Sequence, residues 1–497
     1  MKTVLVKHIK WLWGNAEGIV IFTFFATFAF NIRKIFLTPL SFLSGVFNEY
    51  LTPSFSWADL LILPLIFIYT IKYLLGQCRS SQKDSLSQYN KTYYKSRYGL
   101  YSIAALKLRH FFCFSMSRET IFVFLFLSWM LISIIWSPLK EIAVFRAFSI
   151  TEAFVLAFLA LKFTRKNQLG GRVIEIALII CGAIQAIVAV SQFALNRSLG
   201  IRVLGESILG PDLPGVAKFV IEGVKHIRPY GTFPHPNILA GFLLVPIVIL
   251  IRLIGERIEK TRRGSIVSHE TKFFYFPLVV MTLALALLLI SLILTLSRSA
   301  ILALFVFIIV LIWQKIKTFR LGRRVACIAT LIFLLSFGLF LISKSQFKFL
   351  FSEQSLQERN YYSFVARETI IAHPIGGTGI GQFIYQEYFL HPDLLGWQYQ
   401  PVHNIYLLVT SELGIVGLAL LLLLLLTILN NYCIKCNKSV LRPEILTKRY
   451  YCFIIFSFLF ISLFDHYFWD IKNGIIIFSL PFILLLSKTG KENAFST

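Results

Sequence analysis

The chain has 497 residues, of which 57% are hydrophobic and only 15% are charged, and its mean hydropathy is +0.73. Soluble domains carry roughly a quarter charged residues, so this composition excludes an ordinary soluble protein. The net charge of +25 would suit a nucleic-acid-binding protein. However, the basic residues lie in short clusters between apolar runs, so we expect a protein embedded in membrane lipids with no nucleic-acid partner.

The apolar runs predict an all-α polytopic membrane protein with about twelve transmembrane helices. A run of roughly 20 apolar residues matches the hydrocarbon thickness of a bilayer. Backbone amides in lipid must be paired within the segment, which favours helices, and the alternating pattern of a membrane barrel is absent. The predicted spans cover residues 17–37, 56–76, 119–136, 142–163, 173–195, 237–255, 274–296, 299–317, 325–345, 404–429, 449–466 and 471–487.

The basic residues also predict the orientation of the chain. Of the 49 Lys and Arg residues, 33 fall in alternate connecting segments, a set that includes both termini. The positive-inside rule places these segments, and therefore both termini, in the cytoplasm. The chain then divides into helices one to five (1–195), an extracytoplasmic loop (196–236), helices six to nine (237–345), a larger extracytoplasmic loop (346–403) and helices ten to twelve (404–497).

Seven cysteines occur, and none of them falls in a predicted outer segment. Disulfides are therefore not expected, because they persist in oxidising compartments. Cys433 and Cys436 form a single C-x-x-C pair, whereas a structural zinc site needs four ligands. We expect no metal and no cofactor.

Two arginines stand beside predicted spans on the outer face. Arg228 opens the segment RPYGTFPHPN (228–237), whose three prolines stiffen the backbone. Arg298 lies in the tight turn between the seventh and eighth spans, where a charge needs a partner or must reach the interface. The planar guanidinium suits a phosphate or diphosphate. The alternative for both arginines is that they merely anchor the membrane interface. His235, in the same segment as Arg228, is a secondary candidate.

Residues 357–383 predict an amphipathic helix in the larger outer loop. Phe364, Val365, Ile370 and Ile371 supply its apolar side, and the proline and glycines after residue 372 end it. Arg359 lies on this helix. The stretch GGTGIG does not have the spacing of a dinucleotide-binding loop, so a turn is expected there.

Another polar cluster, after those around Arg228, Arg298 and Arg359, contains His403 and Asn404 at the start of the tenth span. Histidine titrates near neutral pH and commonly serves as a general base. Glu412 follows nine residues later, half a helical turn out of phase with His403. We therefore expect Glu412 to pair with a polar group on another helix.

Three further residues are candidates from their position near the outer face. Arg146 lies one turn inside the fourth span, where its charge would join the other arginines. Asp465 and His466 begin the last outer turn. For each of them, a structural ion pair is the alternative to a role in the reaction.

These four clusters together resemble the O-antigen ligase and O-antigen polymerase superfamily of bacterial envelope proteins. The corresponding segments are RPYGTFPHPNILAG, SRSA, QERNYYSFVARETIIAHPIGGTGIGQF and HNIYLLVTSELGIVG, in this order over about 200–417. The resemblance implies a multi-pass protein of the bacterial inner membrane with an outward-facing active site. It also implies a role in the biosynthesis of lipopolysaccharide or another polysaccharide.

The resemblance further implies a metal-independent glycosyltransferase that moves a glycan from undecaprenyl diphosphate to an acceptor. His403 would activate the acceptor hydroxyl. The substrate-binding candidates are Arg228, Arg298, Arg146, Asn404 and Arg359.

The acceptor stays open between lipid A core, a growing polysaccharide and a protein. Ligases of this family often have a Thr pair after Gly-x-x-Gly, where this chain has Leu418 and Ala419. A polymerase or a protein O-oligosaccharyltransferase is therefore an alternative. A polysaccharide transporter or flippase is the alternative from another class.

Overall fold

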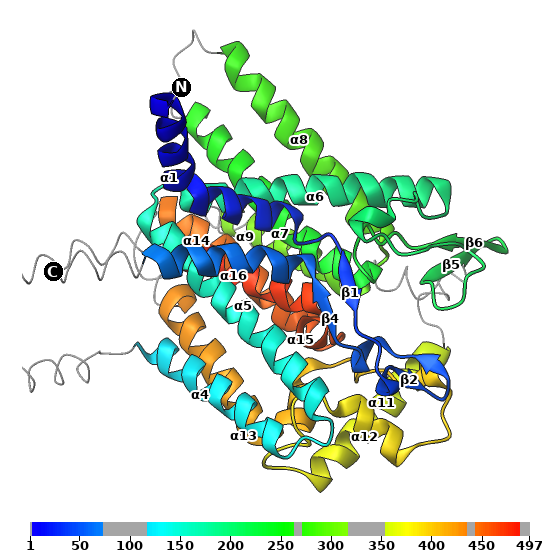
Figure 1. Cartoon of the computed structure of the whole chain (residues 1–497). Coiled ribbons are helices and arrows are strands. Elements are labelled where there is room, and N and C mark those ends of the chain that lie inside the picture. The colour runs from blue at the N-terminus through cyan, green and yellow to red at the C-terminus, as the bar shows by residue number, and fades with distance from the viewer. Residues whose placement is uncertain (1, 73–116, 263–270, 317–352, 435–442, 488–497) are drawn as a thin grey trace, which may run out of the picture.

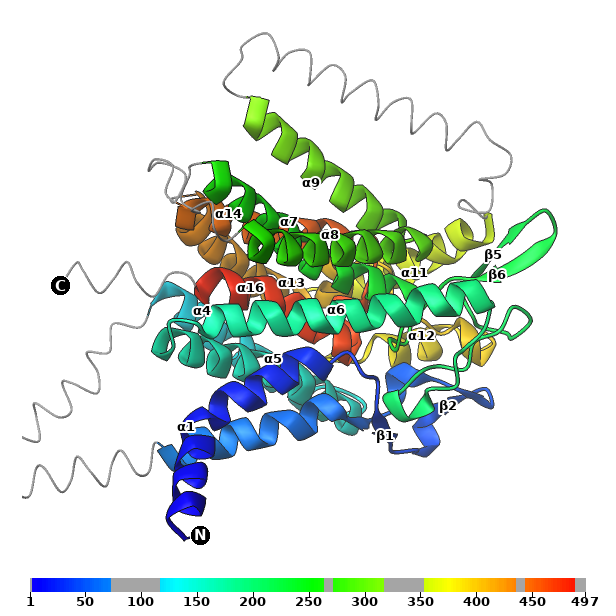
Figure 2. The same cartoon turned by 90° about the horizontal axis from the view of Figure 1, so that it is seen from above.

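The computed structural model describes residues 2–72, 117–262, 271–316, 353–434 and 443–487. Within these ranges the chain is mostly helical, as predicted. Three two-stranded hairpins gather with helices α11 (Glu353–Ala372) and α12 (Phe383–Leu390) at one end of the helical body (Figure 1, Figure 2). We call this end the hairpin end.

Most of the predicted spans coincide with helices of the structure. In the described part of the chain, six helices contain a stretch long and apolar enough to cross a membrane: α4 (Arg118–Ile132), α5 (Lys140–Lys166), α6 (Gly170–Leu195), α7 (Pro236–Arg262), α8 (Thr271–Leu294) and α13 (Ile405–Ile428). Shorter apolar stretches lie in α1 (Lys2–Thr27), α9 (Arg298–Ile316) and α16 (Lys472–Ser487). Residues 57–72 and α14 (Pro443–Ile461) are also helical.

A membrane protein is thereby confirmed in outline. The predicted span 325–345 lies outside the described residues, so the total of twelve spans and the orientation remain predictions.

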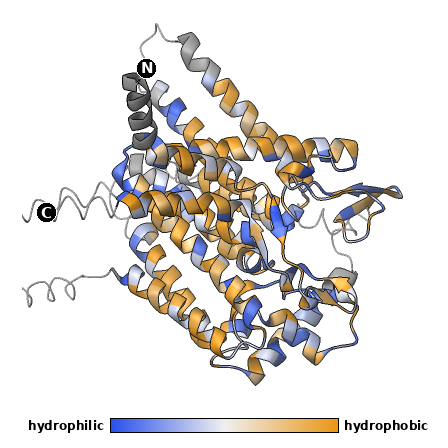
Figure 3. Cartoon of the chain, in the orientation of Figure 1, coloured by the Kyte–Doolittle hydropathy of each residue, from blue (hydrophilic) through white to orange (hydrophobic). Residues whose placement is uncertain are grey.

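The surface of the helical body is rich in apolar side chains, in agreement with a lipid environment. Figure 3 shows apolar residues along most of the described helices. A soluble monomer rarely exposes large contiguous apolar patches. Exposed large apolar side chains occur on five different helices, for example at Phe124, Phe158, Leu283, Leu302 and Leu426.

Buried charges tie three of the helices together on the side away from the hairpin end. Helix α6 packs against α1, α7 and α8, and α14 packs against α7. The carboxylate of Glu175 on α6 lies 2.6 Å from the guanidinium of Arg252 on α7. It also accepts a hydrogen bond of 2.5 Å from the hydroxyl of Tyr451 on α14. All three side chains are buried, so each charge depends on its partner.

The first predicted span ends earlier than expected. Helix α1 ends at Thr27, and residues 33–35 form strand β1 (Arg33–Ile35), which pairs antiparallel with β4 (Ser54–Ser56). Arg33 forms an ion pair with Glu49. A charged residue is costly in lipid, so the chain leaves the helix before Arg33 and pairs it at the hairpin end.

The structure is mostly helical, as predicted, but it adds short strands at the hairpin end that the prediction did not contain. Strand β2 (Phe42–Leu43) pairs with β3 (Val46–Phe47), and β5 (Lys218–Ile221) pairs with β6 (Val224–Ile227). The second hairpin turns through Glu222 and Gly223, both with positive φ, which is the backbone of a tight two-residue turn. Strands this short carry no clear alternation, so their sequence did not distinguish them from loop.

The amphipathic helix is present as α11 and ends at Ala372, where a helix end is predicted. Its buried face differs from the predicted one. Phe364 and Ile371 are exposed, whereas Val365 is buried as expected. The buried face is built from Tyr362, Val365, Ala366 and Thr369, which follow helical spacing.

The glycine-rich segment after α11 docks into a break in α13. Gly414 interrupts that helix with φ 67° and ψ −175°. The backbone N–H of Thr378 donates to the carbonyl of Ser411 (2.9 Å), and that of Ile415 donates to the carbonyl of Pro374 (2.9 Å). A Cβ on Gly414 would lie 1.9 Å from a backbone oxygen of the docked segment. The glycines therefore serve close backbone contact.

One disulfide contradicts the expectation of none. Cys433, just beyond α13, is bonded to Cys452 on α14, with their Cα atoms 5.9 Å apart. The two helices lie next to each other there, which brings together cysteines 19 residues apart in the sequence. Cys436 lies outside the described residues.

Candidate active site

His403 is fixed in the segment that leads into α13. Asn404 caps this helix: its side-chain oxygen accepts from the N–H of Leu407 (3.1 Å), and its amide donates to the carbonyl of Leu463 (3.3 Å). The N–H of Ile405 donates to the carbonyl of Ser462 (2.9 Å). These bonds join the start of α13 to the segment after α14. Asn404 therefore has a positioning role for His403.

The imidazole of His403 lies against two other rings. Its centroid is 4.9 Å from that of His466, and the two rings are nearly perpendicular. The ring of Tyr362 on α11 stacks on its other side, at 5.8 Å. Nδ1 of His403 is buried and has no hydrogen-bond partner among the described residues.

His403 is neutral at physiological pH. Burial, together with the positive charge of His466, lowers its pKa to about 3, although Asp465 acts in the opposite direction. A neutral imidazole has a lone pair with which to accept a proton, as a general base requires.

His466 is held by a carboxylate that the sequence reasoning did not single out. Nδ1 of His466 lies 2.8 and 2.9 Å from the two carboxylate oxygens of Asp470, and its backbone N–H donates to Asp465 (2.9 Å). An ionised carboxylate only accepts, so Nδ1 carries the hydrogen. Asp470 follows His466 by four residues, one helical turn, which is the signal that could have identified the pair.

The two neighbouring carboxylates decide the charge of His466. Burial lowers the pKa of His466, but Asp470 and then Asp465 outweigh it, so the pKa is raised overall. Burial raises the pKa of Asp465, but the charge of His466 and the hydrogen bond from Asn237 act against burial, and the pKa is lowered overall. Asp465 and His466 follow α14, which ends at Ile461. Because each of them shifts the pKa of the other, their charges depend on one another.

Arg228 is linked to the histidines by a chain of hydrogen bonds. Its Nε donates to the carbonyl of Thr295 (2.6 Å), and its Nη2 donates to Oδ1 of Asn237 (2.6 Å). The amide of Asn237 in turn donates to Asp465 (2.7 Å). Burial lowers the pKa of Arg228 to about 10, so it stays protonated at neutral pH. Asn237 is a second positioning residue that the sequence reasoning missed.

Arg228, Arg298 and Arg359 form a series in which neighbouring charges act on each other. Arg298 opens α9 and Arg359 lies on α11. The charge of Arg298 acts on Arg228, and the charge of Arg359 acts on both Arg298 and His403. Gathering like charges is unfavourable unless an anion joins them, so this group is suited to bind one.

His235 has a local role in the structure. Its Nδ1 accepts a hydrogen bond from the backbone N–H of Asn237 (3.2 Å), and its ring lies 6.0 Å from that of Tyr230. Burial, and then Arg228, lowers its pKa to about 3, so it is neutral. It shapes the turn before α7.

Arg146 and Glu412 lie near Asp470 and Trp469. They do not take part in the hydrogen bonds that hold Arg228. The guanidinium of Arg146 donates to the backbone carbonyl of Asp470. Glu412 accepts a hydrogen bond from the indole N–H of Trp469 (2.8 Å) on the short helix α15 (Tyr467–Asp470). Glu412 thus pairs with another helix, as its helical phase predicts.

Residues 283–422 match the family model described as O-antigen ligase. This part of the chain is similar to the O-antigen ligase family. This confirms the resemblance predicted from the four sequence clusters. A comparison with curated proteins finds no match.

The matched segment contains Arg298, Arg359 and His403, whereas Arg228 and His466 lie outside it. The matched family is one of membrane glycan ligases and polymerases. The structure brings residues from inside and outside the matched segment to the same place at the hairpin end.

Proposed function

We propose that this protein transfers a glycan from undecaprenyl diphosphate to an acceptor at the outer face of the bacterial cytoplasmic membrane. The observation that carries this proposal is a series of three arginines, Arg228, Arg298 and Arg359, in which neighbouring charges act on each other and the charge of Arg359 also acts on the neutral His403. An anion with several charged oxygens would relieve the repulsion among the arginines. A neutral base beside that anion is what a transfer to a hydroxyl requires.

The arginines act on the leaving group. As the bond between the anomeric carbon and the diphosphate oxygen breaks, negative charge grows on that oxygen, and positioned donors stabilise it. Arg228 is held for this purpose by Thr295 and Asn237. A diphosphate is a good leaving group, so the arginines need only stabilise its charge.

His403 acts on the acceptor. Its imidazole takes the proton of the acceptor hydroxyl, whose oxygen forms the new bond to the anomeric carbon. The electron pair of the broken glycosidic bond leaves with undecaprenyl diphosphate. The products are the extended acceptor, free undecaprenyl diphosphate and a proton on His403, which then passes to solvent. The displacement is expected to invert the anomeric configuration.

Replacement of His403 tests the proposal directly. We expect His403→Ala to slow glycan transfer by about 10²- to 10⁴-fold, the usual contribution of a general base. Transfer is measured in cells as polymer attachment on a gel, or with the purified protein in proteoliposomes. His226→Ala, on strand β6, is the matched control and is expected to transfer normally. Normal transfer by His403→Ala would overturn the assignment.

The diphosphate site is tested separately by binding. Arg298→Ala is expected to weaken the binding of a polyprenyl diphosphate, whereas Arg202→Ala, an exposed arginine in the segment before β5, is expected to bind normally. An unchanged affinity of Arg298→Ala would contradict the proposed role of the arginines.

The identity of the acceptor distinguishes the alternative activities within the family. Lipid A core would make the protein a ligase, a lipid-linked glycan a polymerase, and a protein an O-oligosaccharyltransferase. Supplying each acceptor in turn with the same donor distinguishes them. A transporter or flippase is less well supported, because the candidate site residues lie near helix ends and the matched family is one of ligases.

A further inference from the structure

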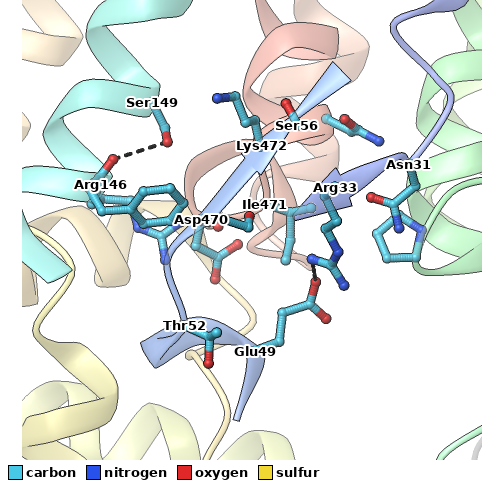
Figure 4. A pocket seen from close by; sticks show the side chains of 14 residues that line it. Asn31, Arg33, Glu49, Thr52, Ser56, Arg146, Ser149, Asp470, Ile471 and Lys472 are labelled. Carbon is cyan, nitrogen blue, oxygen red and sulfur yellow. Dashed lines mark hydrogen bonds and ion pairs between the residues drawn. The ribbon is translucent and has the colours of Figure 1, made fainter. Parts of the chain in front are cut away.

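A second polar pocket lies on the far side of Asp470 from His466. It is lined by residues of the segment 31–56, by α5, by Pro234 and by residues 470–473 at the start of α16. Figure 4 shows Arg33, Glu49 and Thr52 on one side of it and Arg146 and Asp470 on another. Because Asp470 also holds His466, the pocket and the candidate active site share a wall.

The charges in this pocket are already matched by opposite charges or by a carbonyl. Arg33 pairs with Glu49, and Lys472 pairs with Glu152 (2.6 Å) and with Asp59. The guanidinium of Arg146 donates to a backbone carbonyl. A phosphate or diphosphate would therefore meet carboxylates here, in contrast to the group of arginines around His403. This arrangement favours a neutral ligand.

The rest of the lining is suited to hydroxyl groups. Side-chain hydroxyls and amides contribute most of it, namely Asn31, Thr52, Ser54, Ser56, Ser149 and Asn473. Two donors in the wall are almost fully buried and have no hydrogen-bond partner among the described residues: Nδ2 of Asn473 and Nε of Arg146. A buried donor without a partner is costly, so a bound group that accepts from it is favoured.

We propose that this pocket binds one neutral sugar residue of the glycan acceptor. Sugar hydroxyls donate and accept at once, which matches a wall of hydroxyls with spare lone pairs and two unused donors. The ring of Phe145 supplies an apolar surface for the C–H face of a sugar. The pocket is assigned to the acceptor because the diphosphate of the donor would meet carboxylates there. This assignment rests on the proposed glycan transfer.

Binding of simple sugars to the purified full-length protein tests the pocket without any reaction. The probes are D-glucose, D-galactose and N-acetyl-D-glucosamine, followed by saturation-transfer NMR, with D-galacturonate as the charged counterpart. At least one neutral sugar is expected to bind and D-galacturonate to bind more weakly. Asn473→Leu is expected to weaken neutral-sugar binding by about two- to tenfold, the effect of one hydrogen bond.

The controls separate a local effect from misfolding. Ser149→Ala is a milder variant of the pocket and is expected to weaken binding in the same direction. Ser479→Ala, further along α16, is expected to bind as the unaltered protein does. The pocket proposal is overturned if Asn473→Leu and Ser149→Ala, both folded by circular dichroism, bind neutral sugars normally, or if no neutral sugar binds.

This proposal and the proposed function fail in different ways. His403→Ala is expected to lose transfer but keep sugar binding, and Asn473→Leu to raise the KM for the acceptor with little change in kcat. If His403→Ala still transfers glycan, the proposed function fails while the pocket stands. If His403→Ala abolishes transfer but Asn473→Leu leaves the acceptor KM unchanged, the pocket proposal alone fails.

Discussion

The bond between His466 and Asp470 gives the sharpest test of how the site is positioned. Asp470→Asn keeps the shape of the side chain and removes its charge. A hydrogen bond that involves a charged group contributes about 1.5–3 kcal/mol. If the transition state depends on this bond, kcat/KM for glycan transfer falls by about 10- to 150-fold, because each 1.4 kcal/mol is a factor of ten. Both bonds measured from His466 Nδ1, 2.8 and 2.9 Å, lie within the normal range.

The pH profile distinguishes this role from simple destabilisation. Asp470 is the largest factor that raises the pKa of His466 against burial. Its removal therefore lowers that pKa, and the limb of the kcat/KM profile that reports His466 moves to lower pH. His403, with a pKa of about 3, stays neutral and contributes no limb between about pH 5 and pH 9 in the free enzyme.

The assay uses purified full-length protein in proteoliposomes with an undecaprenyl-diphosphate-linked glycan. The control is Asp212→Asn, whose side chain is 83% exposed. A normal rate together with an unmoved limb in Asp470→Asn would refute the positioning role of this carboxylate.

Three further variants probe other contacts. Asn237→Leu removes both the acceptor for Arg228 and the donor to Asp465, so kcat/KM is expected to fall by about tenfold or more in the same assay; Asn237→Asp should not restore it, since it sets a second carboxylate beside Asp465. Glu175→Ala leaves the buried guanidinium of Arg252 with Glu256 as its remaining carboxylate partner and is expected to cost about 1.5–3 kcal/mol, seen as a lower melting temperature in detergent, with a smaller loss for Glu175→Gln. Gly414→Ala forces a side chain into a positive-φ position and against a backbone oxygen, and a melting temperature equal to that of the unaltered protein would contradict the docking described above.

The helical spans were predictable because lipid requires the residues of a span to be predominantly apolar. A run of apolar residues meets that requirement locally, so α5, α6 and α13 begin and end within a few residues of the prediction, and α7 begins within one residue of it. The hairpins were not predictable in this way. Strands of two to four residues depend on turn geometry and on contacts such as that of Arg33 with Glu49. Those contacts join residues far apart in the sequence.

The site was predictable as a set of residue types but not as a set of contacts. Arg228 and His403 stood out because polar groups beside apolar spans are unusual. Asn237 and Asp470 stood out less, since an amide and a carboxylate near a helix end are common. Their importance comes from their hydrogen-bond partners. Asn237 pairs with Asp465, which is distant in the sequence, and Asp470 pairs with His466 across one short helix. Pairings of this kind depend on tertiary structure, which hydropathy and spacing do not contain.

The low pKa of His403 leads to a last prediction: the imidazole becomes a stronger base when a diphosphate is bound. Burial and the positive charges of His466 and Arg359 hold that pKa near 3. A diphosphate bound among the arginines would cancel much of this positive charge, and each unit of recovery in the pKa corresponds to about 1.36 kcal/mol. We expect NMR of isotope-labelled histidine in the full-length protein to show the His403 pKa rising when inorganic diphosphate is added.

The control in the same spectra is His226, on the hairpin β5–β6, whose signals are expected not to respond to added diphosphate. A His403 pKa that does not move at saturating diphosphate would show that the anion binds elsewhere. If it does move, His403 is a weak base in the empty site and a stronger one when the donor is bound. The order of binding would then protect the lipid-linked glycan, because water entering the empty site meets a histidine too weak to activate it.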